Sequence, residues 1–365
     1  MRVTTTASVR RAARSGEASR RLRIALVGPV AQSIPPRRSG SVESVTALLA
    51  DGLVERRHEV TLFATGTSAT RAKVHATFPR GYHEDPDLWP WELCELLNLS
   101  AAVERAAEYD VVHYQAEYAP ISIAFAALCA TPLVTTLHHA PSATEVALWS
   151  RSGSGARFVA VSDHQRRLLG PLDVVATIHH AVDTGAFAPR GEPRDQLVFL
   201  GRFTEGKGVL DAIEIARRAD MRLVLAAAAN DYYTQAVAPH VDGDRIVYAG
   251  ELGMKEKAEL LAASRALLYP VQSAEPFGLV MAEAMACGTP VAALRRGAVE
   301  ELVDHGVTGG VFATTDELLE GLPSVLAIDR EAVRARAVER FGPDRMVDAH
   351  CAAYARLLAA HARGV

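Results

Sequence analysis

The stretch Ser273-Ala-Glu-Pro-Phe-Gly-Leu-Val-Met-Ala-Glu-Ala-Met-Ala-Cys-Gly-Thr-Pro290 decides the fold of this chain, because it predicts a loop that turns into a helix and then stops. Pro276 suits the first helical turn, where the N–H that proline lacks would have no partner. The residues that follow are mostly apolar and good helix formers. Gly288 is placed for a left-handed C-cap, and Pro290 blocks continuation of the helix.

Two carboxylates flank the start of this predicted helix. Glu275 precedes it, and Glu283 lies inside it among apolar residues, where a carboxylate needs a polar partner. Between them, Phe277, Gly278 and Leu279 bring backbone N–H groups to a helix N-terminus, which is a natural site for an anion. The stretch therefore predicts a phosphate-bearing ligand with an acid on either side.

Composition limits the function classes. The chain has 365 residues, enough for two domains, with 49% hydrophobic and 22% charged residues, as in ordinary globular proteins. A net charge of −4 argues against nucleic acid or an anionic membrane surface as the main partner. The four cysteines form no Cys-x-x-Cys pair, which argues against structural zinc and favours a reducing, cytoplasmic compartment. No run approaches the roughly 20 apolar residues of a membrane span.

Residues 1–22 are rich in Arg, Ser, Thr and Ala and contain no apolar run, so they are not a secretory signal. Their composition loosely resembles a transit peptide. We expect instead a disordered tail or an over-long choice of start codon.

Short apolar runs alternate with segments of helical periodicity along the chain, which is typical of parallel α/β sheets. The runs that predict strands are residues 23–28, 59–64, 110–113, 132–138, 157–162, 174–178, 197–201, 222–226, 246–250, 266–270 and 290–294. The segments that predict helices are residues 42–53, 91–108, 119–129, 209–219 and 345–361. Residues 65–90 are polar and show only weak periodicity.

This alternation predicts an α/β protein with two Rossmann-like, doubly wound domains facing each other across a cleft. We place the N-terminal domain at residues 23–183 and the C-terminal domain at residues 184–343. We expect residues 344–365 to form a helix that packs back on the N-terminal domain. Such sheets bind ligands at the carboxyl ends of their strands, so the cleft is the expected site. The Gly-x-Gly-x-x-Gly fingerprint of dinucleotide binding is absent after the first strand.

A glycine-rich turn after one predicted strand carries two cations, Arg202 and Lys207. The chain has only four lysines, and a lysine between Gly206 and Gly208 suits contact with a phosphate, while arginine can bind two oxygens at once. An ordinary solvated turn explains the same residues about as well. Gly40, in the loop that opens the first predicted helix, would allow close approach of a ligand.

His138 and His139 end another predicted strand. A lone histidine is usually structural, and adjacent histidines in a strand point to opposite faces, so a shared metal ion is not expected.

Two of these motifs together resemble the retaining glycosyltransferases of family 4, which have the GT-B fold. They are Gly-Arg-Phe-Thr-Glu-Gly-Lys-Gly, at residues 201–208, and Glu-Pro-Phe-Gly-Leu-Val followed by Glu-Ala-Met-Ala-Cys-Gly-Thr-Pro-Val, at residues 275–291. The block at residues 297–309 is similar to the family's next motif. The resemblance extends over nearly everything from Arg23 to the C-terminus.

The resemblance implies a nucleotide-diphosphate sugar as donor. Arg202 and Lys207 would bind its diphosphate, and Glu283 its ribose. Phe277, Gly278 and Leu279 would hold sugar or phosphate at the helix terminus, Gly40 would touch the diphosphate from across the cleft, and Leu252 would lie by the base.

The resemblance also implies the catalytic residues. Glu275 would contact the transferred sugar near its reacting carbon, and His138 would reach the sugar from the N-terminal domain, which would bind the acceptor. No cofactor and no metal ion are expected, since two fixed cations and a helix terminus can stabilise a departing diphosphate.

Departures from the family pattern gather in the N-terminal half. Gly40-Ser41 replaces the usual Gly-Gly, Ser44 stands where arginine is frequent, and His113-Tyr114-Gln115 replaces a frequent His-x-His. The donor half keeps its charged residues, so we expect a specialised acceptor side. We look for acceptor contacts in residues 35–41 and 65–91.

The expected function is transfer of a sugar, with retention, to a small-molecule, natural-product or lipid-linked acceptor. A nucleotide-sugar epimerase or hydrolase, or a non-catalytic nucleotide-sugar-binding protein, is the alternative. Nucleic acid is not an expected partner, and peripheral contact with a membrane stays open. The base, sugar, acceptor and oligomeric state are not specified by the sequence.

Overall fold

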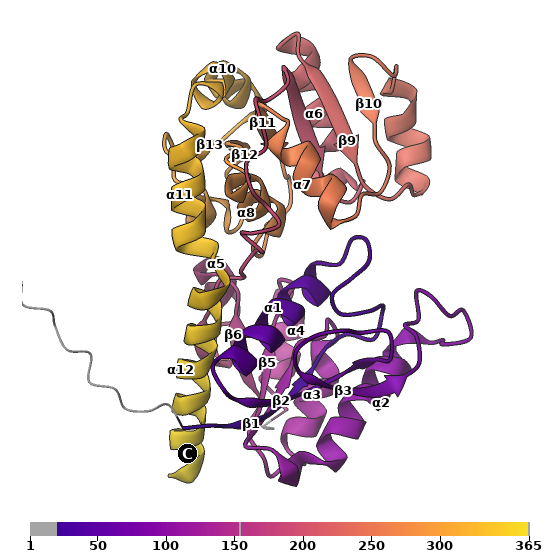
Figure 1. Ribbon diagram of the computed structural model, residues 1–365, viewed down its shortest axis with the longest axis vertical. Coiled ribbons are helices and arrows are strands. Elements are labelled where there is room, and N and C mark those ends of the chain that lie inside the picture. The colour runs from indigo at the N-terminus through magenta and orange to yellow at the C-terminus, as the bar shows by residue number, and fades with distance from the viewer. Residues whose placement is uncertain (1–19, 153–154, 364–365) are drawn as a thin grey trace, which may run out of the picture.

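The computed structural model describes residues 20–152 and 155–363, and Figure 1 shows two stacked α/β domains. The predicted tail lies mostly outside this part of the chain, since residues 1–19 are not described. None of the described helices is long and apolar enough to cross a membrane.

The lower domain in Figure 1 is built on a parallel sheet in the order β3-β2-β1-β4-β5-β6-β7. Its strands are β1 (Arg23–Val27), β2 (Glu59–Thr65), β3 (Lys73–Phe78), β4 (Val111–Tyr114), β5 (Leu133–Thr136), β6 (Arg157–Ala160) and β7 (Asp173–Thr177). Its helices are α1 (Ser41–Glu55), α2 (Trp91–Glu104), α3 (Ala119–Ala126), α4 (Ala143–Trp149) and α5 (Asp163–Leu168), with a short turn at Ala106–Glu108. The central strands are buried on both faces, which explains their unbroken apolar runs.

The upper domain has a second parallel sheet, in the order β10-β9-β8-β11-β12-β13. Its strands are β8 (Gln196–Leu200), β9 (Arg222–Ala226), β10 (Ile246–Tyr248), β11 (Ala266–Tyr269), β12 (Val291–Leu294) and β13 (Gly309–Phe312). Its helices are α6 (Val209–Arg218), α7 (Met254–Ala262), α8 (Leu279–Ala286), α9 (Val299–Leu302), α10 (Thr315–Leu326) and α11 (Arg330–Phe341). Short helical turns occupy Glu205–Lys207, Tyr233–Val237 and Ala238–His240.

The predicted fold class, two Rossmann-like α/β domains, is confirmed by these sheets. Two edge strands, β3 and β13, were not predicted. β3 lies at the margin of its sheet with half-exposed side chains, so its hydrophobic pattern is weak. β13 has only four residues, and two of them are glycines.

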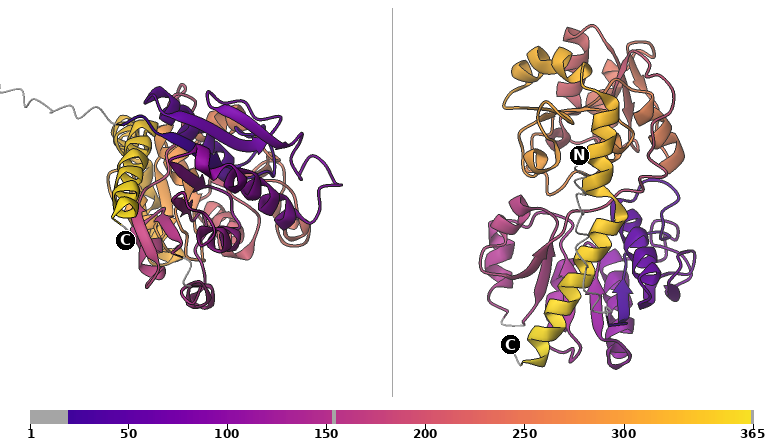
Figure 2. Two further views of the ribbon diagram at one scale, coloured as in Figure 1. Left: turned by 90° about the horizontal axis from the view of Figure 1, so that it is seen from below. Right: turned by 60° about the vertical axis from the view of Figure 1, so that its left-hand side comes forward.

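The last helix, α12 (Pro343–Ala362), crosses from the upper domain to the lower one, as Figure 1 and the right view of Figure 2 show. α11 ends at Phe341, where its carbonyl accepts the N–H of Val182, and Gly342 leads into α12. Along α12, Met346, Val347, Ala353, Tyr354 and Leu357 are buried in the same hydrophobic core as β1 and α1.

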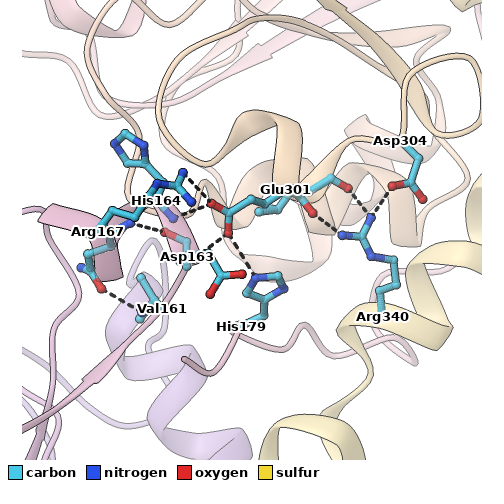
Figure 3. Close-up of polar contacts among 11 residues, drawn as sticks. Val161, Asp163, His164, Arg167, His179, Glu301, Asp304 and Arg340 are labelled. Carbon is cyan, nitrogen blue, oxygen red and sulfur yellow. Dashed lines mark hydrogen bonds and ion pairs between the residues drawn. The ribbon is translucent and has the colours of Figure 1, made fainter. Parts of the chain in front are cut away.

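The carboxylate of Glu301 in α9 also joins the domains (Figure 3). It accepts the backbone N–H groups of Asp163, at 2.7 Å, and His164, at 2.5 Å, at the start of α5. Negative charge at a helix N-terminus is favourable. Arg340 of α11 holds the loop after Glu301 by bonding Asp304 and the carbonyls of Glu301 and Leu302. The junction is thus fixed on the side of the molecule where α12 crosses.

Candidate active site

The loop before α8 positions the predicted anion site. The helix begins at Leu279 rather than near Pro276, because Gly278 adopts φ 88°, ψ 62° and reverses the chain first. A Cβ at this glycine would lie 2.5 Å from the Met281 side chain, so a larger residue would displace Met281. The first N–H groups of an α-helix lack the usual partner four residues back, and in α8 the Met281 N–H donates instead to the Gly278 carbonyl at 3.0 Å. At its other end, Gly288 has φ 73°, which confirms the predicted C-cap.

Glu275 is buried beside this helix start. Its Oε2 accepts hydrogen bonds from Lys207 Nζ, at 2.5 Å, and from the Tyr269 hydroxyl, also at 2.5 Å. Burial and the charge of Glu275 hold the pKa of Tyr269 well above its ordinary value, so the tyrosine stays a donor. The structure thus brings together the two motifs that the sequence singled out. Sequence reasoning missed Tyr269, which looks like an ordinary strand residue.

Glu283 finds its polar partner in Lys257 of α7, whose Nζ lies 2.5 Å from Glu283 Oε1. The side chain of Glu283 is 5% exposed and that of Lys257 25%, so this pair is also largely removed from water. Sequence reasoning predicted that Glu283 needs a partner but did not name Lys257. The scarcity of lysine was the available signal, since two of the four lysines hold these two glutamates.

The other predicted donor-side residues differ in accessibility. Arg202 is exposed and has no ion-pair or hydrogen-bond partner within the described residues. Leu252 is half-buried and packs against the core of the upper domain, and Leu279 packs against the cores of both domains. The Phe277 ring is buried, with its centroid 5.0 Å from that of His180 and 6.1 Å from that of Phe341. Its side chain therefore fills the domain junction.

His138 lies at the end of β5 with both ring nitrogens engaged. Nε2–H donates to Gln115 Oε1 at 2.8 Å, and Nδ1 lies 3.3 Å from His180 Nε2, whose ring stacks on that of His138. Burial and neighbouring histidines lower the pKa of His138 to about 3, so the ring is neutral.

The polar network behind His138 reaches α12. Gln115 Nε2 donates to His113 Nε2 at 3.0 Å, and His113 Nδ1 lies 2.6 Å from the Tyr354 hydroxyl. Gln115 was not predicted as a site residue. The departure from His-x-His at residues 113–115 was the signal that pointed to it.

Gly40 precedes α1 at the end of the β1–α1 loop. This loop meets the upper domain at Glu251, whose carboxylate accepts the Ser39 hydroxyl at 2.6 Å and lies 3.5 Å from Arg38. The β1–α1 loop and the loop before α7 thus touch between the two domains. Over the described residues, no group of three or more His, Cys, Asp or Glu side chains is placed to hold a metal ion.

Comparison with protein families gives two matches in succession. The model described as Glycosyltransferase Family 4 matches residues 42–186, and that described as Glycosyl transferases group 1 matches residues 186–340. Together they extend over both domains.

Several characterised proteins are similar to the chain. The alpha-maltose-1-phosphate synthase of Mycobacterium tuberculosis is 31% identical over 224 residues, which are 50% of this chain and 56% of that protein. The N-acetyl-alpha-D-glucosaminyl L-malate synthase of Bacillus anthracis is 30% identical over 39% of this chain and 41% of its own length. The chain thus spans about half the length of these relatives. The phosphatidyl-myo-inositol mannosyltransferase of Mycolicibacterium smegmatis is 27% identical over 87% of this chain and 89% of its length.

Solved structures share the fold. AviGT4, a glycosyltransferase involved in avilamycin A biosynthesis, superposes with a TM-score of 0.70 at 24% identity over 93% of this chain and 98% of its own. Anabaena HepE in complex with UDP-glucose superposes with a TM-score of 0.66 at 18% identity, over 93% of this chain and all of its own.

Proposed function

This chain belongs to glycosyltransferase family 4, and we propose that it transfers a sugar from a nucleotide diphosphate, with retention, to a small-molecule, natural-product or lipid-linked acceptor. The observation that carries the proposal is the placement of two lysine–glutamate pairs around the N-terminal end of α8. The presence of UDP-glucose in HepE and the role of AviGT4 in avilamycin A biosynthesis support the donor class and a natural-product acceptor.

The donor diphosphate would bind at the start of α8, between Arg202 and Lys207. Lys207 has three N–H groups and gives one to Glu275, so two remain for phosphate oxygens. Arg202 has no competing protein partner within the described residues, so its guanidinium can bind two phosphate oxygens. Fixed cations and helix N–H groups stabilise the charge that develops on the departing nucleotide, and we propose that they do so without a metal ion.

The glutamates would hold the sugars of the donor. Lys257 occupies one oxygen of Glu283, which leaves Oε2 to accept a ribose hydroxyl. Glu275 uses Oε2 for Lys207 and Tyr269, which leaves Oε1 for a hydroxyl of the transferred sugar. Gly40 and the β1–α1 loop would close the diphosphate site from the other domain.

His138 is a poor candidate for the general base, because both its ring nitrogens already have partners. We propose instead that the acceptor oxygen attacks the sugar carbon on the face that the diphosphate leaves. The bond from that carbon to the phosphate oxygen breaks as the new glycosidic bond forms, and the acceptor proton moves to the departing phosphate. His138 would then help to orient the donor sugar.

A thermal-shift screen with UDP-, GDP-, ADP- and TDP-sugars tests the donor site, because a ligand that binds the folded state raises stability by RT ln(1 + [L]/Kd). We expect one nucleotide class to raise the melting temperature and the Glu275→Ala variant to keep that response while losing transfer. Absence of any response, or full transfer by this variant, would refute the proposal.

Once a product is made, proton NMR of its anomeric centre reports the stereochemistry. We expect the configuration of the donor to be kept and the rate to be unchanged by EDTA. An inverted product would exclude the same-face mechanism, and loss of activity with EDTA would exclude metal independence.

A further inference from the structure

Gln115 is buried between His138 and the core of the lower domain. It follows β4 and is 1% exposed, and its backbone N–H donates to the Val27 carbonyl at 2.8 Å, at the end of β1. Its side-chain amide faces two histidines: Oε1 lies 2.8 Å from His138 Nε2, and Nε2 lies 3.0 Å from His113 Nε2. Since Gln115 is closed to solvent and His138 is half-buried, His138 is the member of this pair that a ligand can reach.

The Gln115 amide fixes the tautomer of His138. Burial keeps both neighbouring rings neutral, since it lowers the pKa of His138 to about 3 and that of His113 well below its usual range. A neutral imidazole has one N–H and one acceptor nitrogen. The amide oxygen of Gln115 can only accept, so the hydrogen of His138 lies on Nε2. Its Nδ1 is then the acceptor for the Nε2–H of His180, at 3.3 Å.

The other end of the amide leads to α12. Gln115 Nε2 can only donate, so His113 Nε2 is an acceptor, both for this amide and for the Thr136 hydroxyl at 2.8 Å. The hydrogen of His113 therefore lies on Nδ1, which is 2.6 Å from the Tyr354 hydroxyl oxygen. Tyr354 is 1% exposed and belongs to the helix that arrives from the upper domain. A continuous chain of hydrogen bonds thus joins α12 to His138.

Stability alone is a weak explanation for this chain of buried polar groups. Gln115, His113, Thr136 and Tyr354 are each at most 2% exposed, and burial of polar groups costs free energy that a well-packed apolar core avoids. A fully hydrogen-bonded network instead fixes one arrangement of its members. Here it fixes a half-buried ring just beyond the carboxyl end of β5, the edge where sheets of this kind bind ligands.

We propose that Gln115 is a positioning residue for sugar transfer, which holds the His138 ring in one tautomer and one orientation toward the donor sugar. Tyr354 supports it, because its hydroxyl fixes His113, to which the Gln115 amide is bonded. This inference rests on the proposed glycosyl transfer and deepens it at the sugar subsite. It also links the packing of α12 to the geometry of that subsite, since Tyr354 is part of α12.

Gln115→Met tests this role, because methionine has a similar length and lacks both amide groups. A small displacement of a group that orients the substrate slows the chemical step, so we expect kcat to fall about tenfold. The Kd of the nucleoside diphosphate should stay unchanged, because the proposed nucleotide contacts lie mainly in the upper domain. A folded Gln115→Met variant with unchanged kcat would overturn the inference.

Gln115→Glu is the rescuing variant, because one carboxylate oxygen can accept the Nε2–H of His138. The other oxygen can accept from His113 once the hydrogen of that ring moves to Nε2 and Tyr354 donates to Nδ1. We expect kcat to be clearly above that of Gln115→Met. Equal losses in the two folded variants would contradict the role of Gln115 as an acceptor for His138.

Gln196→Met is the matched control. Gln196 is 3% exposed, lies in β8 of the upper domain and donates to Ser264 Oγ at 3.3 Å. Removal of this buried amide should leave kcat unchanged. A tenfold fall in this variant too would show that loss of any buried glutamine slows transfer, which would contradict a specific role for Gln115.

Tyr354→Phe removes the far end of the chain and keeps the aromatic ring. We expect a smaller fall in kcat than in Gln115→Met, and no further fall when the two changes are combined, because both act through His138. Independent, multiplicative losses would contradict a shared chain. Should Gln115→Met fail to fold, an unchanged kcat in Tyr354→Phe would overturn the inference.

Nitrogen NMR of protein labelled in its histidines gives a readout besides activity, because protonated and unprotonated ring nitrogens differ in chemical shift. We expect His138, assigned from the signals lost in His138→Phe, to carry its hydrogen on Nε2 and to become a mixture of tautomers in Gln115→Met. A role in folding alone would leave the tautomer unchanged. Hydrogen on Nδ1 in the unmodified protein, or an unaltered tautomer in Gln115→Met, would therefore overturn the inference.

Donor binding and turnover are measured separately from these effects. Failure of the donor screen would refute the glycosyltransferase proposal. Turnover of a donor at the unmodified rate by Gln115→Met would refute only the positioning role of Gln115.

Discussion

Glu275 and Glu283 of the upper domain each bond a lysine at 2.5 Å, whereas Glu43 and Glu95 of the lower domain have no cationic partner among the described residues. All four carboxylates are almost completely buried. The donor side therefore combines acids with cations, as a diphosphate sugar requires. The acceptor side buries acids without a cation, and burial raises the pKa of both, that of Glu95 to about 8. A buried carboxyl without a cationic partner is thus favoured in its protonated form.

The largest expected effect is that of Lys207→Met. The change removes a cation from the proposed diphosphate site, and loss of one such group lowers transfer by about 10³-fold. It also leaves the buried carboxylate of Glu275 with Tyr269 alone, which destabilises the fold by about 3 kcal/mol. Steady-state kinetics and thermal unfolding measure the two effects.

The double variant Lys207→Met/Glu275→Gln separates these effects. With no unpaired buried charge left, we expect its stability to recover toward that of the unmodified protein, while transfer stays lost. Recovery of transfer in the double variant would mean that Lys207 serves only to neutralise Glu275.

At Glu95, on the acceptor side, we expect removal of the charge to stabilise the fold rather than to destabilise it. Its pKa, raised to about 8 by burial, lies above the ordinary value of 4.5. The protonated form is favoured in the folded state, so its contribution is complete below about pH 4.5 and is lost as the pH rises through 8. Glu95→Gln keeps the shape without the charge. At pH 9 we expect this variant to be more stable by several kcal/mol, since each pKa unit corresponds to about 1.4 kcal/mol.

Thermal unfolding of both proteins at pH 5 and pH 9 checks this prediction. The stability gain should shrink or vanish at pH 5. A variant that is less stable than the unmodified protein at both values would show that Glu95 works in the fold as a charged hydrogen-bond acceptor.

A smaller effect is expected at the ribose position. Glu283→Gln keeps an oxygen for Lys257 but removes the charge that orders the proposed ribose contact. We expect the Kd of the nucleoside diphosphate to rise about tenfold, or about 1.4 kcal/mol. Calorimetry measures this, and a nucleoside monophosphate with the same base should lose the same factor. A loss confined to the diphosphate would place Glu283 at the phosphates instead.

The smallest effect is expected at Glu301, whose carboxylate is bonded by two backbone N–H groups, while Arg167, at 3.8 Å, and His179, at 3.6 Å, lie farther away. Glu301→Gln weakens these bonds and should lower the free energy of unfolding by about 1 kcal/mol. The neighbouring Glu300 pairs with Arg295 on the surface, so Glu300→Gln is the control and should change little. Similar losses in both variants would show that the junction does not depend on this carboxylate.

Most of the architecture was predictable because buried parallel strands appear as unbroken apolar runs. The donor-side motifs were predictable for another reason: Gly278, Gly288 and the charged turn at residues 201–208 are local features that need only neighbouring residues. The lysine–glutamate pairs could not be predicted in this way. Lys207 and Glu275 are 68 positions apart, and Lys257 and Glu283 are 26 apart. Only the folded structure therefore shows which lysine bonds which glutamate.

The acceptor side was harder still. Residues 65–90 showed weak periodicity, because β3 is an exposed edge strand and the loop that follows it is held by contacts to the β1–α1 loop. The burial of Glu95 could not be predicted, since an acid in α2 looks like any surface residue of an amphipathic helix. That acceptor contacts lie in residues 35–41 and 65–91 stays a prediction, and Tyr82 and Trp91 fall within the second range.

The crossing of α12 affects the order in which this chain can fold during synthesis. Tyr354, Leu357 and their neighbours complete the core around β1 and α1, yet they belong to the last 20-residue helix. The core formed by β8, β9, α6 and α10 uses only residues 197–325. The first domain to be translated is therefore the last one able to close its core. Until the C-terminal helix leaves the ribosome, the lower domain exposes the apolar groove that this helix will fill, a natural substrate for a chaperone.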